Sequence, residues 1–494
     1  MEGGAEMTMY KNFRDKKVAV VGLARSGVGA ANLCVRLGAV TTVFDIKAVE
    51  ELEGFIQQLD SSVVVKAGGF ADDAFTSFDT VVVSPGVALN IPSLLRAKSD
   101  GIRIIGELEL AYQVLEELRK VGAAAYLAIT GTNGKSTTTT LLYEILRQSG
   151  FNTIIGGNIG MAVTEEISKI VKNFEKPREF VSPDYIVTEV SSFQLESIDK
   201  FKPKVSAVLN ITPDHLDRHE TMDEYVEAKA RIFLNQDAMN FLILNADDPL
   251  TRGLAKRVGK NGPDVLFFSR KERVRGAFYK DGVIYFNIPE LEILCPELVD
   301  ASKVGAGKNP FTFNTSDFTI VGGHNIENAM AAALMALVSG CKVTDIWNTL
   351  VSFKGLEHRL EFVTEKKAVK YFNDSKGTNV WSVVKSLESF TEPIVLIAGG
   401  RDKSGDFSPL RHLVKERVKA LVLIGEAGGK LRDALGDLTQ VHFAGDMFEA
   451  AKVAGELAVA GDVVLLSPAC ASFDMFKDFE ERGRVFKEAV MRLT

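Results

Sequence analysis

The stretch Ile129-Thr-Gly-Thr-Asn-Gly-Lys-Ser-Thr137 predicts a phosphate-binding loop. An apolar run, Tyr126 to Ile129, precedes it as a short strand, and residues 138 to 146 follow it as a helix. Backbone amides of a glycine-rich turn, a lysine ammonium and a helix N-terminus all favour phosphate oxygens. The loop is a shorter variant of GxxxxGK[ST], because its first glycine is Gly131. The alternative, a tight turn with an exposed lysine, is disfavoured by the strand and the helix around it.

Each loop residue has an expected contact with a nucleotide. Lys135 is expected to contact the β and γ phosphates, and Ser136 or Thr137 offers a hydroxyl to Mg²⁺. The other expected contacts of the loop are Gly131, Thr132, Asn133 and Gly134.

Length, charge and cysteine spacing bound the class of protein. The 494 residues suit about three domains, and 58 basic against 65 acidic residues disfavour a nucleic-acid or anionic-membrane surface. No apolar stretch of about 20 residues appears, and the N-terminus lacks an apolar leader segment. The cysteines lie far apart, which argues against a zinc site or disulfide framework and favours a reducing cytoplasm: Cys34, Cys295, Cys341 and Cys470.

The N-terminal segment predicts a βαβ unit of the Rossmann kind. A buried strand, Lys17 to Gly22, runs into a GxAxxG turn, an alanine-rich helix and a second strand that ends at Asp45. Taken alone, this unit weakly suggests a dinucleotide cofactor, with the acidic residue on a ribose hydroxyl. Further strands follow, and Ser84-Pro-Gly86 forms a turn where one of them ends.

The rest of the chain predicts two more α/β units. We expect domains at 1–121, 122–353 and 354–494: Rossmann-like, central P-loop with a mostly parallel sheet, and Rossmann-like. Residues 262–319 are expected to be a small β insertion, and 169–183 a surface excursion. Three such units with one phosphate loop favour a transferase or ligase that bridges several substrates.

Several polar residues follow predicted strands, where α/β proteins place their chemistry. Glu189 is a plausible Mg²⁺ ligand or a helix cap, and His215 lies in a dense Asp-His-Leu-Asp-Arg-His run. Lys229 by pattern is a solvated helix lysine. Asn325 and Asn328 share a helix face, where they either hold a nucleotide or cap the helix.

The phosphate loop and these polar residues follow one another along the chain in the order found in the ATP-dependent Mur ligases, which the sequence resembles. The C-terminal run Leu465 to Gly483 resembles the D-glutamate-adding branch of that family. The resemblance covers almost the whole chain. It implies that ATP phosphorylates the alanyl carboxylate of UDP-N-acetylmuramoyl-L-alanine and that D-glutamate then attacks the acyl phosphate. It also implies two Mg²⁺ sites, one on Ser136 and Glu189 and one on His215 and Lys229, with Lys229 N-carboxylated by CO₂.

The resemblance also implies roles for the remaining site residues. Expected ATP contacts in addition to the loop are Asn325, Asn328, Arg359 and Asp374. Expected contacts to the UDP-linked substrate are Leu23, Ala24, Arg25, Ser26, Asp45, Ile46, Lys47, Ser84, Gly86, Asn90 and Asn158. Expected contacts to D-glutamate are Lys376, Thr378, Lys403, Ser472 and Phe479. The expected catalytic set is Lys135, Glu189, His215 and Lys229. We expect a monomer.

Three rival interpretations remain at this stage. A folylpolyglutamate synthetase shares the loop and the acyl phosphate chemistry but lacks the N-terminal nucleotide-binding domain. An NAD-dependent oxidoreductase would explain the Gly22 turn but leaves the phosphate loop unexplained. A catalytically silent nucleotide-binding scaffold would require loss of phosphate or metal groups, and none is missing from the sequence.

Overall fold

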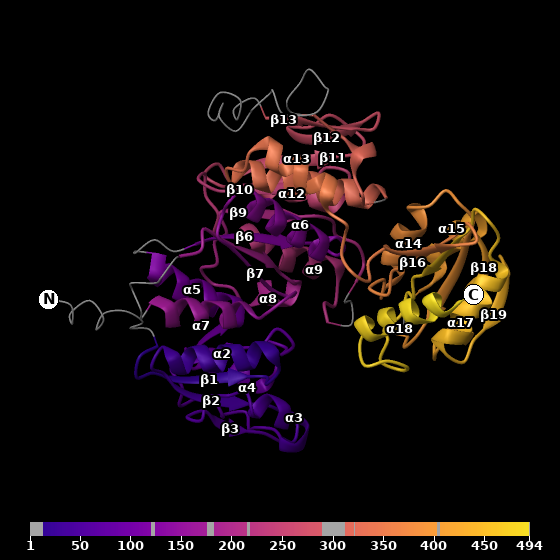
Figure 1. The fold of residues 1–494 in the computed structure, drawn as a ribbon. Coiled ribbons are helices and arrows are strands. Elements are labelled where there is room, and N and C mark those ends of the chain that lie inside the picture. Colours follow the sequence, from indigo (N-terminus) through magenta and orange to yellow (C-terminus); the bar gives the residue numbers. More distant parts are fainter. Residues whose placement is uncertain are drawn as a thin grey trace. The chain divides into compact units, whose positions relative to one another are not determined.

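The computed structural model describes residues 13–119, 124–174, 182–214, 218–288, 312–320, 322–402 and 406–493 (Figure 1). The chain divides into two compact units, Met1–Phe313 with Ala329–Thr349, and Asn314–Asn328 with Leu350–Thr494. The domain borders predicted from the sequence stay predictions.

The first unit begins with a five-stranded parallel sheet in the order β3-β2-β1-β4-β5. Its strands are β1 (Lys17–Val21), β2 (Val40–Phe44), β3 (Val64–Lys66), β4 (Thr80–Val83) and β5 (Arg103–Gly106). Its helices are α2 (Arg25–Arg36), α3 (Val49–Ile56), α4 (Pro92–Ser99) and α5 (Glu107–Arg119). The strand order reverses between β1 and β4, so the turns after these two strands border the crevice where such sheets bind ligands.

A nine-stranded sheet in the order β14-β13-β12-β11-β10-β9-β6-β8-β7 follows. Its strands are β6 (Ala125–Thr130), β7 (Thr153–Gly157), β8 (Tyr185–Glu189), β9 (Val205–Val208), β10 (Phe241–Asn245), β11 (Asp264–Ser269), β12 (Gly276–Lys280), β13 (Val283–Asn287) and β14 (Thr312–Asn314). The helical segments are α6 (Lys135–Gln148), α7 (Val163–Phe174), α8 (Ser192–Glu196), α9 (Met222–Ala230), η1 (Arg231–Phe233), α10 (Pro249–Leu254), η2 (Ala255–Arg257), η4 (Thr315–Asp317), α12 (Gly323–Val338) and α13 (Val343–Ser352).

Two sequence expectations for this part of the chain need adjustment. The short strands of the 262–319 segment are present, but β11 pairs parallel with β10 and so continues the central sheet. The surface excursion predicted from residue 169 is wrong for 169–174, which form the last turns of α7. The reason is that Ile167, Ile170 and Val171 share one helix face and are buried. Residues 175–181 and 289–311 lie outside the described residues.

Helices α2, α5 and α7 join the two sheets of the first unit (Figure 1). Their apolar faces contribute to one continuous core, with Leu33 of α2, Leu115 of α5 and Ile167 of α7 among its fully buried members. A Cβ on Gly29 would lie 2.6 Å from Thr164 Oγ1, so the glycine permits the close approach of α2 to α7. The first two sheets are therefore held together by packing.

The second unit contains a six-stranded sheet in the order β15-β16-β20-β17-β18-β19, parallel except for β15. Its strands are β15 (Glu361–Lys366), β16 (Val369–Asn373), β17 (Ile394–Gly399), β18 (Val418–Ile424), β19 (Gln440–Phe443) and β20 (Val463–Leu466). The helical segments are α14 (Val380–Glu388), η5 (Ser408–Leu410), α15 (Arg411–Arg417), α16 (Gly428–Leu435), α17 (Met447–Leu457) and α18 (Phe479–Arg492). Separate apolar cores cover its two faces. Among the described residues, no helix is long and apolar enough to cross a bilayer.

Candidate active site

Strand β6 lies between β8 and β9, at the point where the strand order of the central sheet reverses. The phosphate loop follows β6, Glu189 ends β8, and Asn210 follows β9. Because these strands are parallel, the three segments meet at the same edge of the sheet. The sequence-predicted loop and Glu189 are therefore neighbours.

Two glycines give the loop its shape. Gly134 has a φ of 84° and directly precedes α6, and Gly131 has a φ of 150°. A Cβ on Gly131 would lie 3.1 Å from Leu209 Cβ and 3.3 Å from the amide nitrogen of Asn210. The Lys135 ammonium donates to the carbonyl oxygens of Gly131 at 2.9 Å and Thr132 at 2.8 Å. The lysine charge thus lies over the loop whose amides would bind phosphate.

Asn210 braces the loop and was not predicted as a site residue. Its Oδ1 accepts from the amide of Asn133 at 2.8 Å, and its Nδ2 donates to the carbonyl of the same residue at 3.0 Å. Its own carbonyl accepts from the Thr132 amide at 2.9 Å. An amide side chain directly after a buried strand was the available signal.

Glu189 is the buried centre of a polar cluster at the end of β8. It is 2% exposed, its Oε2 accepts from Ser136 Oγ at 2.7 Å, and its Oε1 accepts from Asn158 Nδ2 at 2.7 Å. The nearby Thr137 Oγ1 is buried and has no hydrogen-bond partner among the described residues. A carboxylate, two hydroxyls and an amide are the hard oxygen donors that suit Mg²⁺. The cluster therefore fits a divalent cation beside the phosphate loop.

Lys229 is a buried lysine, not the solvated lysine that the sequence pattern predicts. Its side chain is 1% exposed, and its Nζ donates to the Gly131 carbonyl at 2.9 Å. Burial, followed by the positive charge of Lys135, holds the pKa of Lys229 well below its usual value, although Asp214 and Glu189 act in the opposite direction. A neutral amine is therefore accessible at this position.

Tyr225 connects Lys229 to the loop and was missed by the sequence analysis. The Lys229 Nζ lies 4.5 Å from the Tyr225 ring centroid, and the Tyr225 hydroxyl lies 3.3 Å from Thr132 Oγ1. The two residues are one turn apart on α9, so the i, i+4 spacing was the available signal. His215, predicted as the partner of Lys229 on a metal, lies outside the described residues.

The residues predicted to hold the UDP-linked substrate gather around the turns after β1, β2 and β4. Asp45 is mostly buried and accepts from the amides of Leu23 at 2.6 Å and Lys47 at 2.9 Å, so its carboxylate organises both turns. Ser84 Oγ donates to the Gly22 carbonyl at 2.8 Å. The remaining candidates of this sheet lie on or beside the same turns, namely Ala24, Arg25, Ser26, Ile46, Gly86 and Asn90. Asn158 lies apart from them, beside Glu189.

The other predicted nucleotide contacts lie at the start of α12, a helix that the two units share, and in the second unit. Asn325 and Asn328 are buried in the first turns of α12, where Asn328 Nδ2 donates to Asn325 Oδ1 at 3.2 Å. Asp374 is buried, its Oδ2 accepts from Ser386 Oγ at 2.6 Å, and burial raises its pKa. Arg359 Nε is buried and lacks a hydrogen-bond partner among the described residues. An unpaired guanidinium nitrogen is suited to an incoming anion.

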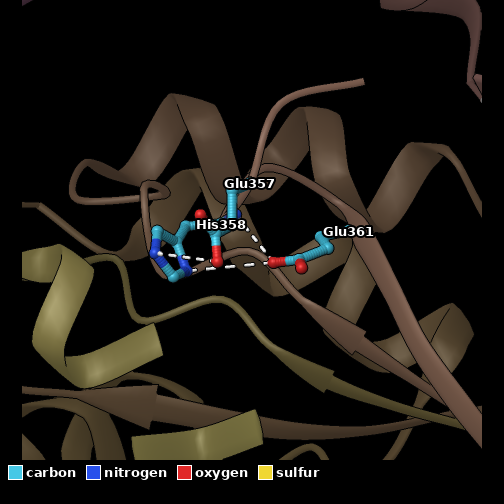
Figure 2. A group of neighbouring side chains, drawn as sticks. All are labelled: Glu357, His358 and Glu361. Carbon is cyan, nitrogen blue, oxygen red and sulfur yellow. Dashed lines mark hydrogen bonds and ion pairs between the residues drawn. The ribbon is translucent and has the colours of Figure 1, made fainter. Parts of the chain in front are cut away.

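Glu357, His358 and Glu361 bring three possible ligand atoms within 4.8 Å of one another (Figure 2). The Lys487 ammonium pairs with both carboxylates, at 2.9 Å from Glu361 Oε1. Asn373 Nδ2 lies 2.9 Å from His358 Nδ1 and donates to Glu361 Oε2 at 3.0 Å. Because the Lys487 ammonium and the Asn373 amide already donate to this group, we interpret it as support for the left-handed turn at His358 (φ 64°) rather than a metal site.

The predicted D-glutamate residues meet after β16 and β20 of the second unit. The Lys376 ammonium lies 3.7 Å from the Phe479 ring centroid, and Ser375 Oγ donates to the Phe479 carbonyl at 2.8 Å. Ser472 is 2% exposed and lies in the loop after β20. The Thr378 amide donates to the Lys376 carbonyl at 2.8 Å. Lys403 lies outside the described residues.

Arg482 clamps these two loops together and was not predicted. Its fully buried guanidinium donates to Ser375 Oγ at 3.0 Å and to the carbonyls of Ser375, Cys470 and Ala471 at 2.8, 3.1 and 3.2 Å. Burial lowers its pKa to about 10. We expect Arg482→Met to lower the free energy of unfolding by about 3 kcal/mol, because three buried carbonyls lose a charged donor.

Thermal and urea unfolding of the intact chain check this prediction. The matched control is Arg484→Met, which removes an exposed arginine from the same helix and is expected to change stability by less than about 0.5 kcal/mol. Equal stability of the two variants would contradict the clamp.

The described residues define a class: an α/β protein with three largely parallel sheets and a glycine-rich loop of the phosphate-binding type after β6. Family models match it in three consecutive segments. Residues 16–106 match the Mur ligase MurD-like N-terminal domain, 129–336 the Mur ligase middle domain, and 358–470 the Mur ligase glutamate ligase domain.

Curated relatives extend the match over nearly the whole chain. A protein of Geotalea daltonii (strain DSM 22248 / JCM 15807 / FRC-32) named UDP-N-acetylmuramoylalanine–D-glutamate ligase is 44% identical over 97% of this chain and 98% of its own length. One of the same name from Clostridioides difficile (strain 630) is 41% identical over 98% of this chain and 100% of its own length. This chain belongs to the Mur ligase family.

Solved structures agree on the fold. UDP-N-acetylmuramate-alanine ligase MurC from Thermotoga maritima is 19% identical, with a TM-score of 0.55, over 96% of this chain and 99% of that one. MurF ligase from Thermotoga maritima, in complex with ADP, is 16% identical, with a TM-score of 0.57, over 92% and 95%. The predicted three-part α/β architecture is confirmed.

Proposed function

We propose that this enzyme joins D-glutamate to UDP-N-acetylmuramoyl-L-alanine with ATP, in peptidoglycan precursor synthesis. The observation that carries the proposal is the 41% to 44% sequence identity, over nearly the whole chain, to relatives of that name, combined with a complete phosphate loop. The rival oxidoreductase leaves that loop unexplained. The rival folylpolyglutamate synthetase leaves the first sheet, which matches the MurD-like N-terminal model, unexplained.

The proposed reaction has two steps. The substrate's alanyl carboxylate oxygen forms a bond to the γ phosphorus of ATP, and the bond to the β–γ bridging oxygen breaks to release ADP. The amine of D-glutamate then attacks the acyl carbon, phosphate leaves, and the amine loses a proton. Phosphorylation turns a poor electrophile into one with a good leaving group, and the site holds amine and acyl carbon together.

This chain's residues supply positioning and charge. Lys135 and the loop amides would offset negative charge on the transferring phosphoryl oxygens. Ser136 and Glu189 would hold one Mg²⁺, and His215 with an N-carboxylated Lys229 a second. When bound, Mg²⁺ neutralises charge on the phosphates. The depressed pKa of Lys229 supports carboxylation, which requires a neutral amine.

The remaining predicted contacts complete the proposal. Asn325, Asn328, Arg359 and Asp374 would contact ATP, the last two after domain closure. The turns after β1, β2 and β4 would hold the UDP end of the UDP-linked substrate. The Lys376 ammonium suits a carboxylate of D-glutamate. The proposal includes a cytoplasmic location and a monomeric state.

Phosphate release tests the reaction directly. The purified chain is incubated with ATP, Mg²⁺ and UDP-N-acetylmuramoyl-L-alanine, with D-glutamate, L-glutamate or no amine. We expect release that requires D-glutamate. Release with another amino acid only would keep the ligase class and discard the acceptor, and no release under any condition would favour the silent scaffold.

A further inference from the structure

Arg218, on the segment between β9 and α9, reaches across to the turn that follows β4 of the first sheet. Its Nη1 donates to the carbonyl oxygens of Gly86 at 3.2 Å and Pro85 at 3.5 Å, and its Nη2 donates to that of Val87 at 3.0 Å. The side chain is 20% exposed. One guanidinium thus satisfies three successive carbonyls of a turn in another part of the unit, which suits its planar fork of donors.

The other face of Arg218 is fixed by α8. Its Nη2 also donates to Glu196 Oε2 at 3.2 Å, and its guanidinium carbon lies 4.6 Å from the Phe193 ring centroid. Helix α8 begins three residues after Glu189, with a capping box between Ser191 and Gln194. The arginine is therefore oriented by the element that follows the candidate Mg²⁺ ligand.

From Arg218 a continuous set of contacts leads to the phosphate loop. The His219 ring stacks on the Phe193 ring, with centroids 5.4 Å apart, and lies 5.1 Å from the Tyr225 ring. Tyr225 in turn contacts Thr132 and Lys229. The turn after β4 and the loop after β6 are thus connected through packed, half-buried or buried side chains.

The two sheets do not need Arg218 to stay together. Helices α2, α5 and α7 already join them through a shared apolar core. Arg218 instead acts at the carboxyl edges of both sheets, where the two ends of a long substrate would bind. A fixed spacing between these edges matters for catalysis, because a misplacement of about 1 Å can cost about 10²-fold in rate.

From this geometry we infer that Arg218 is a positioning residue for the UDP-linked substrate. It fixes the spacing between the turn 84–87 and the phosphate loop. The inference rests on the proposed function, since it requires a substrate that spans both edges. It assigns no contact between Arg218 and the reacting atoms.

The test compares a short and a long ligand. UDP alone would occupy only the first sheet, whereas UDP-N-acetylmuramoyl-L-alanine spans both edges. For Arg218→Met, calorimetry is expected to show UDP affinity within twofold of the unsubstituted chain and about tenfold weaker binding of the full substrate. KM for the full substrate should rise by a similar factor and kcat should fall, with KM for ATP within about twofold. Arg218→Lys is expected to restore part of the loss.

The matched control is Arg257→Met, which removes an exposed arginine that pairs with Glu227 and should change none of these values. Unchanged full-substrate affinity in Arg218→Met, or an equal loss for UDP and the full substrate, would overturn the inference. If the methionine variant fails to fold, the lysine variant carries the same comparison. A chain without substitutions that binds neither ligand would instead overturn the proposed function, and the inference with it.

Discussion

Replacing Lys135 with methionine is expected to lower kcat/KM for ATP by about 10³-fold, which corresponds to roughly 4 kcal/mol of transition-state stabilisation. The ammonium lies over the phosphate loop and, with no nucleotide present, donates to the carbonyls of Gly131 and Thr132. With ATP bound, the same ammonium would contact the phosphoryl oxygens, where negative charge develops. Steady-state phosphate release measures the loss.

Two further variants separate chemistry from folding. Lys172→Met removes an exposed lysine of α7 and is expected to retain full activity. Lys135→Arg keeps the charge but not the compact ammonium, so it should recover only part of the rate. Thermal unfolding shows whether Lys135→Met is folded. A folded Lys135→Met variant within about threefold of normal kcat/KM would contradict the assigned role of this lysine.

The sequence was sufficient for the parts of the site that local pattern encodes. The phosphate loop, the strand before it and the carboxylate at the end of β8 were all predicted, because each depends on residues that are adjacent in the chain. The resemblance supplied roles for distant residues such as Lys229. Pattern alone placed that lysine in solvent, and the structure buries it.

Contacts between distant segments were not predictable in this way. Asn210 pairs with the loop backbone from 77 residues away, and Arg482 bridges Ser375 and Cys470 from inside a helix whose sequence is strongly polar. The position of Asn210 just after a buried strand is a local signal, but it does not identify the loop as its partner, and nothing in the local spacing marks Arg482. Their roles arise from which strand ends become neighbours, which depends on the strand order of the sheet.

Lys229 combines these two kinds of information. Its burial, the neighbouring Lys135 charge and its depressed pKa come from the structure, while the proposed N-carboxylation comes from the family resemblance. The sign of the shift agrees with the proposal: a lower pKa increases the neutral fraction at neutral pH, and only the neutral amine adds to CO₂. The product would be an anion with oxygen ligands in place of an ammonium.

Lys229→Arg is therefore expected to lower kcat by about 10³-fold, because a guanidinium stays charged and supplies no oxygen to a metal. The same protein should lose a carbamate signal that the unsubstituted chain shows in ¹³C NMR after exposure to ¹³C-bicarbonate. Lys200→Arg, on the exposed surface, should retain both the signal and the rate. Retention of kcat by Lys229→Arg, or a signal that persists in it, would show that the ammonium itself serves at this position and that carboxylation is not part of the site.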